Sequence, residues 1–406
     1  MPLTSESRAN VKTFGAKGDG IVDDTAAIQD AIDTAMLAGG GVVFLPVGVY
    51  KTTAGLRCTS GHVSFLGVGQ GSIIKPVGNF DSIRFAAPGN AYIYGNVIAD
   101  IAFDEAAKPG GHTIVGEYVA QFHAMRVYGG GGWNAWCFHN FNNVTLDHCR
   151  FEGYRGVYYG RATGGGAGPG KGRSDVLRLF GLVFGGERRA GIVGIDIDGF
   201  VHTVNGWGIH FVNIGAQALL ARNTFGAELD PMFFTFDDLE CDYPGLECIR
   251  LDAGQRFFFN NSQLHGTQGD ASNIYIAEGV RGVSFTGGFS TGARQAGIAI
   301  AGQDVTVSAM HFYANSNPQF GGEKNAYPGI LLGHTSRDVA INGCRSGQES
   351  TQDYQSSGCQ VDTRADGFVI VGNDFRYNVR PDVNNGAGRG PSRLITHNIP
   401  AVDGSL

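Results

Sequence analysis

Two carboxyl groups lie two residues apart in the segment GIVGIDIDG, residues 191–199. If Ile195 and Ile197 point inward from a β-strand, Asp196 and Asp198 point outward together. Residues i and i+2 of a strand are roughly 6.5–7 Å apart, close to the ~6.5–9.5 Å between acid and base in inverting glycoside hydrolases. We therefore predict Asp196 and Asp198 as catalytic candidates. The alternative is a pair of solvated aspartates at a strand edge.

A second acidic cluster occurs in the segment FDDLECDYPGLE, residues 236–247. If Phe236 and Cys241 face the interior, Asp237, Glu240 and Asp242 are candidates for the outer surface. Carboxyl groups in such a cluster could exchange protons with a substrate, bind sugar hydroxyls or hold Ca²⁺ through their oxygens. No EF-hand-like loop supports calcium, so we predict a catalytic or sugar-binding role and no metal site. A plain acidic surface is the competing interpretation.

Substrate-binding candidates are side chains that stack on sugar rings, pair with sugar hydroxyls or carry positive charge. These residues are Trp133, Trp207, Arg250, Asn260, Gln263 and His265. A lyase would need a base and a cation opposite a substrate carboxylate, and no motif singles out either. The residues therefore favour a hydrolase over a lyase.

Composition limits the classes of protein to which these residues could belong. The chain has 406 residues with 65 Gly, 42% hydrophobic residues and a formal net charge of −7. This charge favours neither a nucleic acid nor an anionic membrane as a partner, and no apolar run is long enough to span a membrane. Seven irregularly spaced cysteines and the absence of CxxC and HExxH predict buried thiols, with no cofactor.

An internal repeat must position the candidate residues. Two apolar residues separated by one residue, often followed by a third, recur from about Val144 onward, as in Phe234/Phe236/Cys241. A second apolar pair follows each time after a turn, and both markers advance by roughly 20–30 residues per repeat. Short strands at this period predict an all-β, single-stranded parallel β-helix. Its polar insertion at 315–328 is expected to form a loop on a flank that binds ligands.

One helix is expected, directly after Asp24, with apolar residues at helical spacing and Gly39 to Gly41 at its end. It would cover the open first coil of the solenoid. We accordingly divide the chain into a capping segment (1–40), a β-helix (41–378) and a C-terminal tail (379–406).

The segments VKTFGAKGDGIVDDTAAIQDAI and GGGVVFLPVGVY resemble the N-terminal signature of the pectate-lyase-like superfamily, which includes many bacteriophage tailspike and capsule-depolymerase proteins. The resemblance implies a right-handed β-helix and commonly a homotrimer. It also implies a carbohydrate-directed protein, but it does not fix the reaction, since the superfamily contains lyases, hydrolases, isomerases and non-enzymatic binders. Together with the outward carboxylates, it predicts recognition and depolymerisation of a bacterial surface or extracellular polysaccharide. The alternative function is a non-catalytic receptor-binding spike or adhesin, on a phage or phage-like particle, that binds capsular polysaccharide.

The N-terminal sequence MPLTSESRAN has no apolar segment of the signal-peptide type. We therefore expect the protein on a virion or phage-like particle surface, or in the cytoplasm until lysis. The few residues that flank the repeats predict that a separate attachment protein would join it to the particle.

Overall fold

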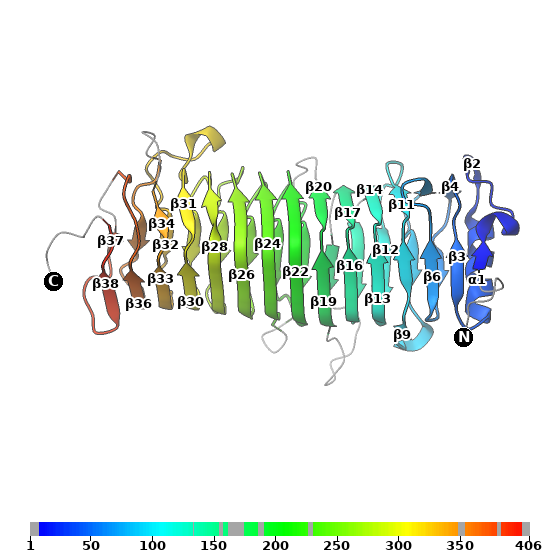
Figure 1. The fold of residues 1–406 in the computed structure, drawn as a ribbon, viewed down its shortest axis with the longest axis horizontal. Helices are drawn as coiled ribbons and strands as arrows, with labels where there is room; N and C mark the ends of the chain where they lie inside the picture. Colours follow the sequence, from blue (N-terminus) through cyan, green and yellow to red (C-terminus); the bar gives the residue numbers. More distant parts are fainter. Residues whose placement is uncertain are drawn as a thin grey trace. The chain divides into compact units, whose positions relative to one another are not determined.

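The computed structural model describes residues 8–132, 134–153, 157–160, 174–185, 191–225, 230–347, 354–379 and 383–399. The chain divides into two compact units. Unit 1 comprises residues 1–186 and 195–205, and unit 2 comprises residues 187–194 and 206–406. Each unit is built from parallel strands that stack coil upon coil (Figure 1). The predicted parallel β-helix is therefore confirmed.

Unit 1 contains the helix α1, Thr25–Leu37, at its N-terminal end (Figure 1). Its buried face consists of Ile28, Ala31, Ile32 and Ala35, and it packs against the first strands of the unit. The carboxylate of Asp23 accepts hydrogen bonds from the Thr25 backbone and hydroxyl groups at 3.0 and 2.5 Å, where the helix begins. The expected helix is thus confirmed and lies where a cap would lie.

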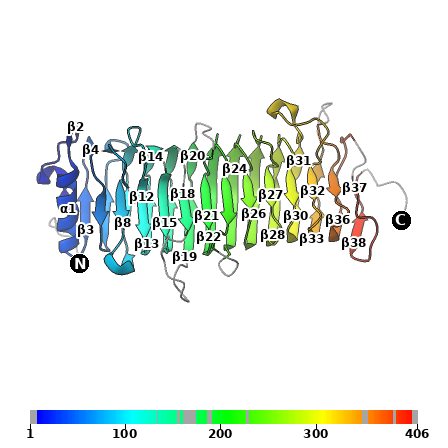
Figure 2. The same ribbon diagram turned by 180° about the vertical axis from the view of Figure 1, so that it is seen from behind.

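The remaining elements of unit 1 are two short 3₁₀ turns and two parallel sheets. The turns are η2 (Val11–Phe14) and η3 (Pro88–Asn90). The first sheet contains β1 (Arg8–Asn10), β2 (Asp19–Asp23), β3 (Gly41–Phe44), β4 (Gly48–Thr52), β6 (Val63–Leu66), β7 (Ser72–Pro76), β9 (Ile93–Tyr94), β10 (Val97–Ala99), β11 (Ala102–Asp104), β13 (Val119–Met125), β14 (Tyr128–Gly132), β16 (Asn142–Asp147), β17 (Arg150–Gly153), β19 (Ser174–Phe180) and β20 (Val183–Gly185). The second sheet, visible in Figure 2, contains β5 (Leu56–Cys58), β8 (Ile83–Phe85), β12 (His112–Glu117), β15 (Asn134–His139), β18 (Val157–Gly160) and β21 (Ile195–Asp198).

Unit 2 repeats the same arrangement, and the first strands of its first sheet, β22, β24, β26 and β28, are longer, at 11 or 12 residues. That sheet contains β22 (Val201–Val212, which begins in unit 1), β24 (Met232–Asp242), β26 (Gln255–His265), β28 (Arg281–Thr291), β30 (Gln303–Ser308), β31 (His311–Tyr313), β33 (Arg337–Asn342), β34 (Arg345–Ser346), β36 (Asp366–Val371) and β38 (Arg393–Thr396). The second sheet contains β23 (Leu219–Arg222), β25 (Ile249–Leu251), β27 (Ile274–Ile276), β29 (Ile298–Ile300), β32 (Ile330–Leu332), β35 (Cys359–Val361) and β37 (Val383–Asn385), and η5 spans Pro318–Phe320.

The strand register in unit 2 reproduces the repeat in the sequence. Phe236 of β24 pairs with Phe259 of β26, which pairs with Phe285 of β28. Their rings are stacked, with centroids 5.6 and 4.7 Å apart. Each inward side chain therefore rests on its counterpart in the next coil and fills one continuous core.

The seven cysteines belong to the same interior. All are free and buried among the described residues, as the sequence predicted. Burial raises the pKa of the Cys149 thiol to about 12, so this thiol stays protonated and unreactive. No helix in the described ranges has the length and hydropathy of a membrane span.

Corners in the backbone decide which side chains of the long strands point outward. Gly208, Asp238, Asn261 and Gly287 have φ of 60°, 53°, 52° and 69°, a conformation that Gly, Asn and Asp adopt at low cost. In β24 this corner interrupts the simple alternation, and the buried residues are therefore Phe234, Phe236, Leu239 and Cys241. Outward side chains consequently fall into two groups, one before the corner and one after it.

The insertion at 315–328 forms a loop that turns back over earlier coils of unit 2 (Figure 1). Its Phe320 ring lies 5.9 Å from the ring of Tyr243. A Cβ atom added at Gly266 or Gly292 would approach the Phe320 ring to 3.2 or 2.9 Å, so glycine makes room for it there. Since Tyr243 and Gly266 directly follow Asp242 and His265, the loop flanks the strand ends that carry those residues.

Candidate functional site

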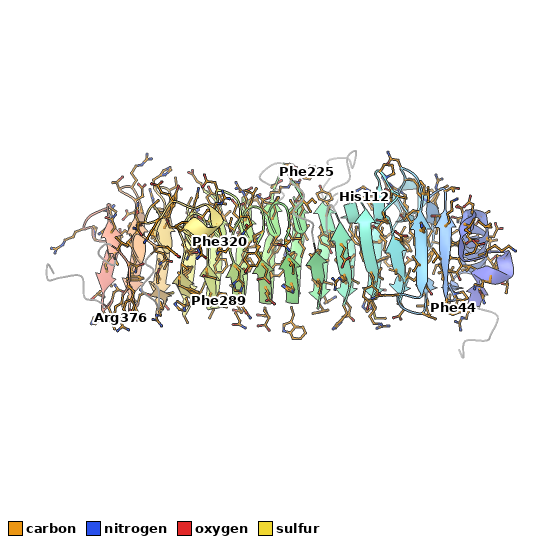
Figure 3. All side chains as sticks on the ribbon, turned by 90° about the horizontal axis from the view of Figure 1, so that it is seen from above. Phe44, His112, Phe225, Phe289, Phe320 and Arg376 are labelled. Carbon is orange, nitrogen blue, oxygen red and sulfur yellow. The ribbon has the colours of Figure 1, made fainter. Side chains whose placement is uncertain are left out.

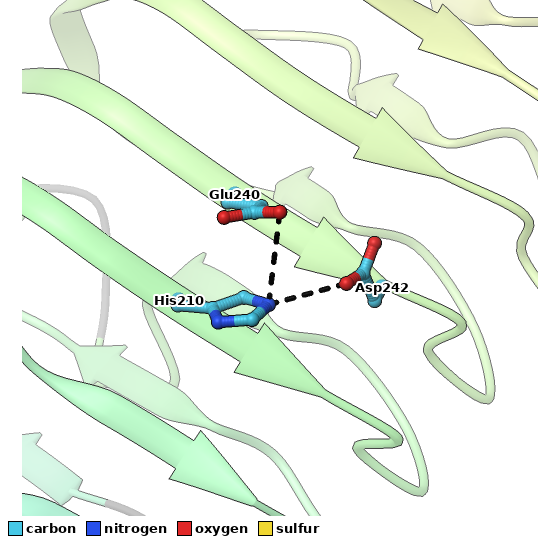
Figure 4. A group of neighbouring side chains, drawn as sticks. All are labelled: His210, Glu240 and Asp242. Carbon is cyan, nitrogen blue, oxygen red and sulfur yellow. Dashed lines mark hydrogen bonds and ion pairs between the residues drawn. The ribbon is translucent and has the colours of Figure 1, made fainter.

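Four chemically active side chains meet on the outer face of unit 2, after the corners of β22, β24 and β26. These residues are His210 of β22 and Glu240 and Asp242 of β24, which Figure 4 shows, and His265 of β26. Their neighbours along the strands, Phe211, Cys241 and Leu264, are fully buried. Alternation about these anchors directs the four polar side chains away from the core.

Asp242 lies between two imidazole rings. Its Oδ2 atom is 3.2 Å from His210 Nε2, and its Oδ1 atom is 3.8 Å from His265 Nε2. Glu240 Oε1 lies 3.9 Å from His210 Nε2 (Figure 4). The cluster therefore holds two carboxylates and two imidazoles within 4 Å of a neighbour, and both kinds of group can exchange protons with a substrate.

The cluster is accessible but not fully solvated. The exposed fractions of the side chains are 34% for His210, 42% for Glu240, 25% for Asp242 and 31% for His265. The backbone beneath them is fixed by the sheet, because Asn213 N donates to Asp242 O at 2.9 Å and so ties the end of β22 to β24. A ligand could reach the polar atoms, while the strands keep their spacing.

The residues before the corner form a separate polar group. Asn260 Nδ2 donates a hydrogen bond to Asp237 Oδ1 at 2.6 Å, and Asn261 Nδ2 donates to Asp238 Oδ1 at 2.5 Å. Trp207, directly before the corner of β22, is 53% exposed. This side of the corner therefore offers amide groups and a free indole face.

Aromatic side chains continue the outer face beyond the cluster. The His265 ring lies 4.8 Å from Phe289 in an edge-to-face contact, and Phe289 lies 6.0 Å from Tyr313. Tyr313 in turn lies 4.6 Å from the ring of His311. Phe289 and Phe320 are labelled in Figure 3. The polar cluster is thus continued along the coils by rings that could stack on a sugar chain.

The structure therefore places most of the predicted residues on three adjacent strands, on the two sides of their corners. Seven of them lie on β22, β24 and β26 in unit 2: Trp207, Asp237, Glu240, Asp242, Asn260, Gln263 and His265. Gln263 pairs in register with Glu240, and Asn260 with Asp237. Sequence reasoning placed these side chains outward, and the strands do so.

Asp196 and Asp198 differ from the expectation. All four residues of β21, Ile195–Asp198, are buried, and Asp196 and Asp198 are only 2% and 3% exposed. Both take part in interactions within the protein. The expectation of an accessible carboxylate pair is wrong at this point, because both side chains are buried.

Arg250 and Trp133 are not among the residues that the structure brings to the cluster. Arg250 lies on β25 in the second sheet, where its guanidinium contacts Glu247 Oε1 at 2.7 Å and Asp252 Oδ1 at 2.8 Å. It also lies over the ring of Tyr275, at 4.9 Å from the centroid. Trp133 is outside the described residues.

Sequence reasoning missed His210. The signal was present in the segment NGWGIHFV, because buried Ile209 and Phe211 leave His210 on the outward face. Among the residues that the structure describes, His210, Glu240 and Asp242 are also the one group of three potential metal ligands, with one ligand atom of each within 4.8 Å of the others.

The predicted resemblance to the pectate-lyase-like superfamily is confirmed by comparison with known families. Residues 8–152 match the family model described as rhamnogalacturonase A/epimerase, pectate lyase-like. Alginate lyase 7 of Azotobacter vinelandii is 44% identical over 107 residues, which cover 23% of this chain and 12% of that protein. The capsule KN3-specific depolymerase 1 of Klebsiella phage KN3-1 is 66% identical over 32 residues, covering 8% of this chain and 4% of that protein.

A solved structure extends the likeness in fold beyond the N-terminal region. Tailspike protein 3 of bacteriophage CBA120 matches with a TM-score of 0.76 and 17% sequence identity. The match covers 98% of this chain and 62% of that protein. This chain therefore has the fold of the tailspike over nearly its whole length, while it spans only a small part of the curated relatives that it matches.

Proposed function

We propose that the protein recognises and depolymerises a bacterial surface or extracellular polysaccharide on the outer face of β22, β24 and β26. The observation that carries this proposal is the cluster of His210, Glu240, Asp242 and His265, which lies on the accessible surface of a β-helix. The relatives support the substrate class, because an alginate lyase and a capsule depolymerase share short similar segments with this chain.

In the proposed reaction, the two carboxyl groups of β24 have different roles. Glu240, the more exposed, donates a proton to the leaving glycosidic oxygen as the bond to the sugar carbon breaks. Asp242 stabilises the positive charge that develops on the sugar ring, and His210 and His265 hold its carboxylate in place. Water then forms the new bond to the sugar carbon and returns a proton to Glu240, which leaves a new reducing end. One carboxylate oxygen of Glu240 and one of Asp242 lie within 4.8 Å of each other. This separation is shorter than the ~6.5–9.5 Å of inverting pairs and closer to the ~5–5.5 Å of retaining pairs.

The remaining outward residues are proposed to bind the polymer. Trp207 stacks on a sugar ring before the corner, while Asn260 and Gln263 bind hydroxyl groups. The rings of Phe289 and Tyr313 extend the binding surface to later coils. Such a row of subsites suits a chain-like substrate.

Incubation with a panel of purified bacterial capsular and extracellular polysaccharides tests the proposal. We expect shorter chains with new reducing ends, and we expect Glu240→Gln to slow product formation by about 10²–10⁴-fold while glycan binding persists. Asp238→Asn is the matched control, since Asp238 is on the same strand and its left-handed backbone accepts asparagine. A protein that binds a glycan and leaves its length unchanged would contradict the enzymatic role. Unsaturated uronates among the products would show that the reaction is that of a lyase and not a hydrolysis.

The second candidate function is a non-catalytic receptor-binding spike of a phage or phage-like particle. It is favoured by the tailspike fold over nearly the whole chain. In this case Glu240→Gln would leave binding intact and no variant would change polymer length. For either function we propose a homotrimer that a separate attachment protein joins to the particle. A single-chain mass in light scattering would contradict the trimer.

A further inference from the structure

We propose that His210, Glu240 and Asp242 bind a divalent first-row transition-metal ion, for which Zn²⁺ is the reference. The sequence contains no linear metal-binding motif, because the three ligands come from two coils of the solenoid. The inference goes beyond the proposed function, since binding of the ion requires no glycan and no cleavage.

The spacing of the three ligand atoms is close to that of a metal site. Zinc ligands lie about 2.0–2.2 Å from the ion, so two ligands in a tetrahedral site are roughly 3.4 Å apart. His210 Nε2 lies 3.2 Å from Asp242 Oδ2 and 3.9 Å from Glu240 Oε1 (Figure 4). The third separation is at most 4.8 Å. A small rotation of the exposed Glu240 side chain would close the remaining gap.

The kinds of donor atom favour a transition metal over calcium or magnesium. Ca²⁺ and Mg²⁺ prefer oxygen ligands, whereas imidazole suits zinc and its first-row neighbours. The two carboxylates also offset the charge of a divalent ion. The cluster is therefore a mixed nitrogen and oxygen donor set and not only a group of acidic residues.

His265 adds a second imidazole on the other side of Asp242. Its Nε2 atom lies 3.8 Å from Oδ1 of Asp242, the oxygen that does not face His210. It can orient the carboxylate from the outer shell, as such partners do in metal sites, or supply a fourth ligand. The partial exposure of all four side chains leaves an entry path and room for bound water.

Metal binding and acid–base catalysis would use the same oxygen atoms. An ion held by Glu240 and Asp242 would occupy the carboxylates that the proposed cleavage needs free. We therefore expect Zn²⁺ to inhibit cleavage reversibly and a chelator to restore it. Binding itself is measured without substrate, so its failure and the failure of the proposed function can be told apart.

The full chain is first treated with a chelator and then titrated with Zn²⁺ in a calorimeter, which measures the affinity and the number of ions bound. Titration with Co²⁺ gives a second readout, because bound Co²⁺ has a visible absorption band. We expect one ion per chain, and at least a tenfold loss of affinity in His210→Ala and in Asp242→Asn. Should His210→Ala melt at a much lower temperature than the wild-type protein, His210→Gln replaces it. His148→Ala, which removes an exposed histidine of unit 1, is the control and is expected to bind normally.

Three outcomes would overturn the metal site. The first is the absence of saturable Zn²⁺ binding. The second is an affinity unchanged by His210→Ala and Asp242→Asn, which would place the ion elsewhere. The third is displacement of Zn²⁺ by an equimolar amount of Ca²⁺, which would contradict the choice of a transition metal.

Discussion

Two pairs of carboxylates with the same sequence spacing end in opposite environments. Asp196 and Asp198 on β21 in unit 1 are 2% and 3% exposed. Glu240 and Asp242 on β24 in unit 2 are accessible and contact histidine. Both pairs alternate in the sequence with buried apolar residues, Ile195 and Ile197 in β21 and Cys241 in β24. The difference teaches that such alternation does not by itself determine whether water reaches the carboxylates.

The two strands differ in how their outer faces are used. β21 is a short strand of the second sheet, and Asp196 pairs in register with Tyr158 of β18. β24 is an 11-residue strand with a corner, and its outward residues after the corner adjoin His210 and His265. We therefore expect substitutions in the first pair to change stability and substitutions in the second pair to change activity.

The largest expected effect is on catalysis. Glu240→Gln should lower the depolymerisation rate by about 10²–10⁴-fold, the range for loss of a general acid. Asp196→Asn should lower it by less than tenfold when equal amounts of folded protein are compared. The release of reducing ends over time measures both. The comparison would be reversed if Asp196→Asn were the inactive variant.

The next effect is on stability, and here the buried carboxylate should matter more than the exposed one. Asp196→Ala should lower the free energy of unfolding by about 1–3 kcal/mol, because it removes a buried polar group and leaves its partners unsatisfied. Glu240→Gln, at the surface, should change it by about 0.5 kcal/mol or less. Thermal and urea denaturation measure the difference. Equal effects of the two substitutions would contradict the assignment of separate roles.

A smaller effect is expected for binding. Trp207→Ala should weaken glycan affinity by about 0.5–1.5 kcal/mol, or roughly 2–12-fold, if the exposed indole stacks on a sugar. Tyr377→Ala removes another exposed aromatic residue of unit 2, at a distant position in the sequence, and serves as the control. Affinity is measured with a catalytically inactive Glu240→Gln background. A larger loss of affinity in Tyr377→Ala than in Trp207→Ala would contradict the assignment of Trp207 to the binding surface.

The smallest effect concerns a carboxylate of intermediate exposure in unit 1. Burial alone would raise the pKa of Asp81, but hydrogen bonds from His112 and Arg84 outweigh it and hold the pKa well below its usual value. The Asp81 carboxylate is 21% exposed, with Arg84 Nη2 at 2.8 Å and His112 Nδ1 at 2.9 Å.

A lowered pKa in the folded state stabilises the protein above the pKa of the unfolded state, and this stabilisation is lost as the pH falls through the folded value. Asp81→Asn should therefore cost on the order of 1 kcal/mol at pH 7. The cost should shrink from about pH 5 downward. Melting temperatures of both proteins across this range provide the measurement. A difference that stays constant with pH would show that the charge of Asp81 does not contribute.

The fold could be predicted from the sequence because its signals are local and repeated. Apolar pairs such as Phe257/Phe259 recur in phase, and the register of the strands follows them. The helix after Asp24 was equally clear from its apolar spacing. The outward direction of Glu240 and Asp242 followed from buried Cys241 between them.

The remaining features of the site depend on contacts between coils. No sequence pattern states that His210 meets Asp242, because the two residues are distant in the sequence and adjacent only through the coil spacing. Burial of Asp196 likewise depends on what covers β21 and not on its own alternation. The position of Arg250, in the second sheet with Glu247 and Asp252, also required the three-dimensional arrangement.

The left-handed corners of the long strands have a consequence for how such a protein can diversify. Each of Gly208, Asp238, Asn261 and Gly287 turns the backbone within its own coil. The apolar residues that face the core maintain folding, while the outward polar residues are under no such constraint. Substitutions of outward residues in two or three adjacent coils can therefore change the ligand preference during evolution. The β-helix that carries these residues stays the same.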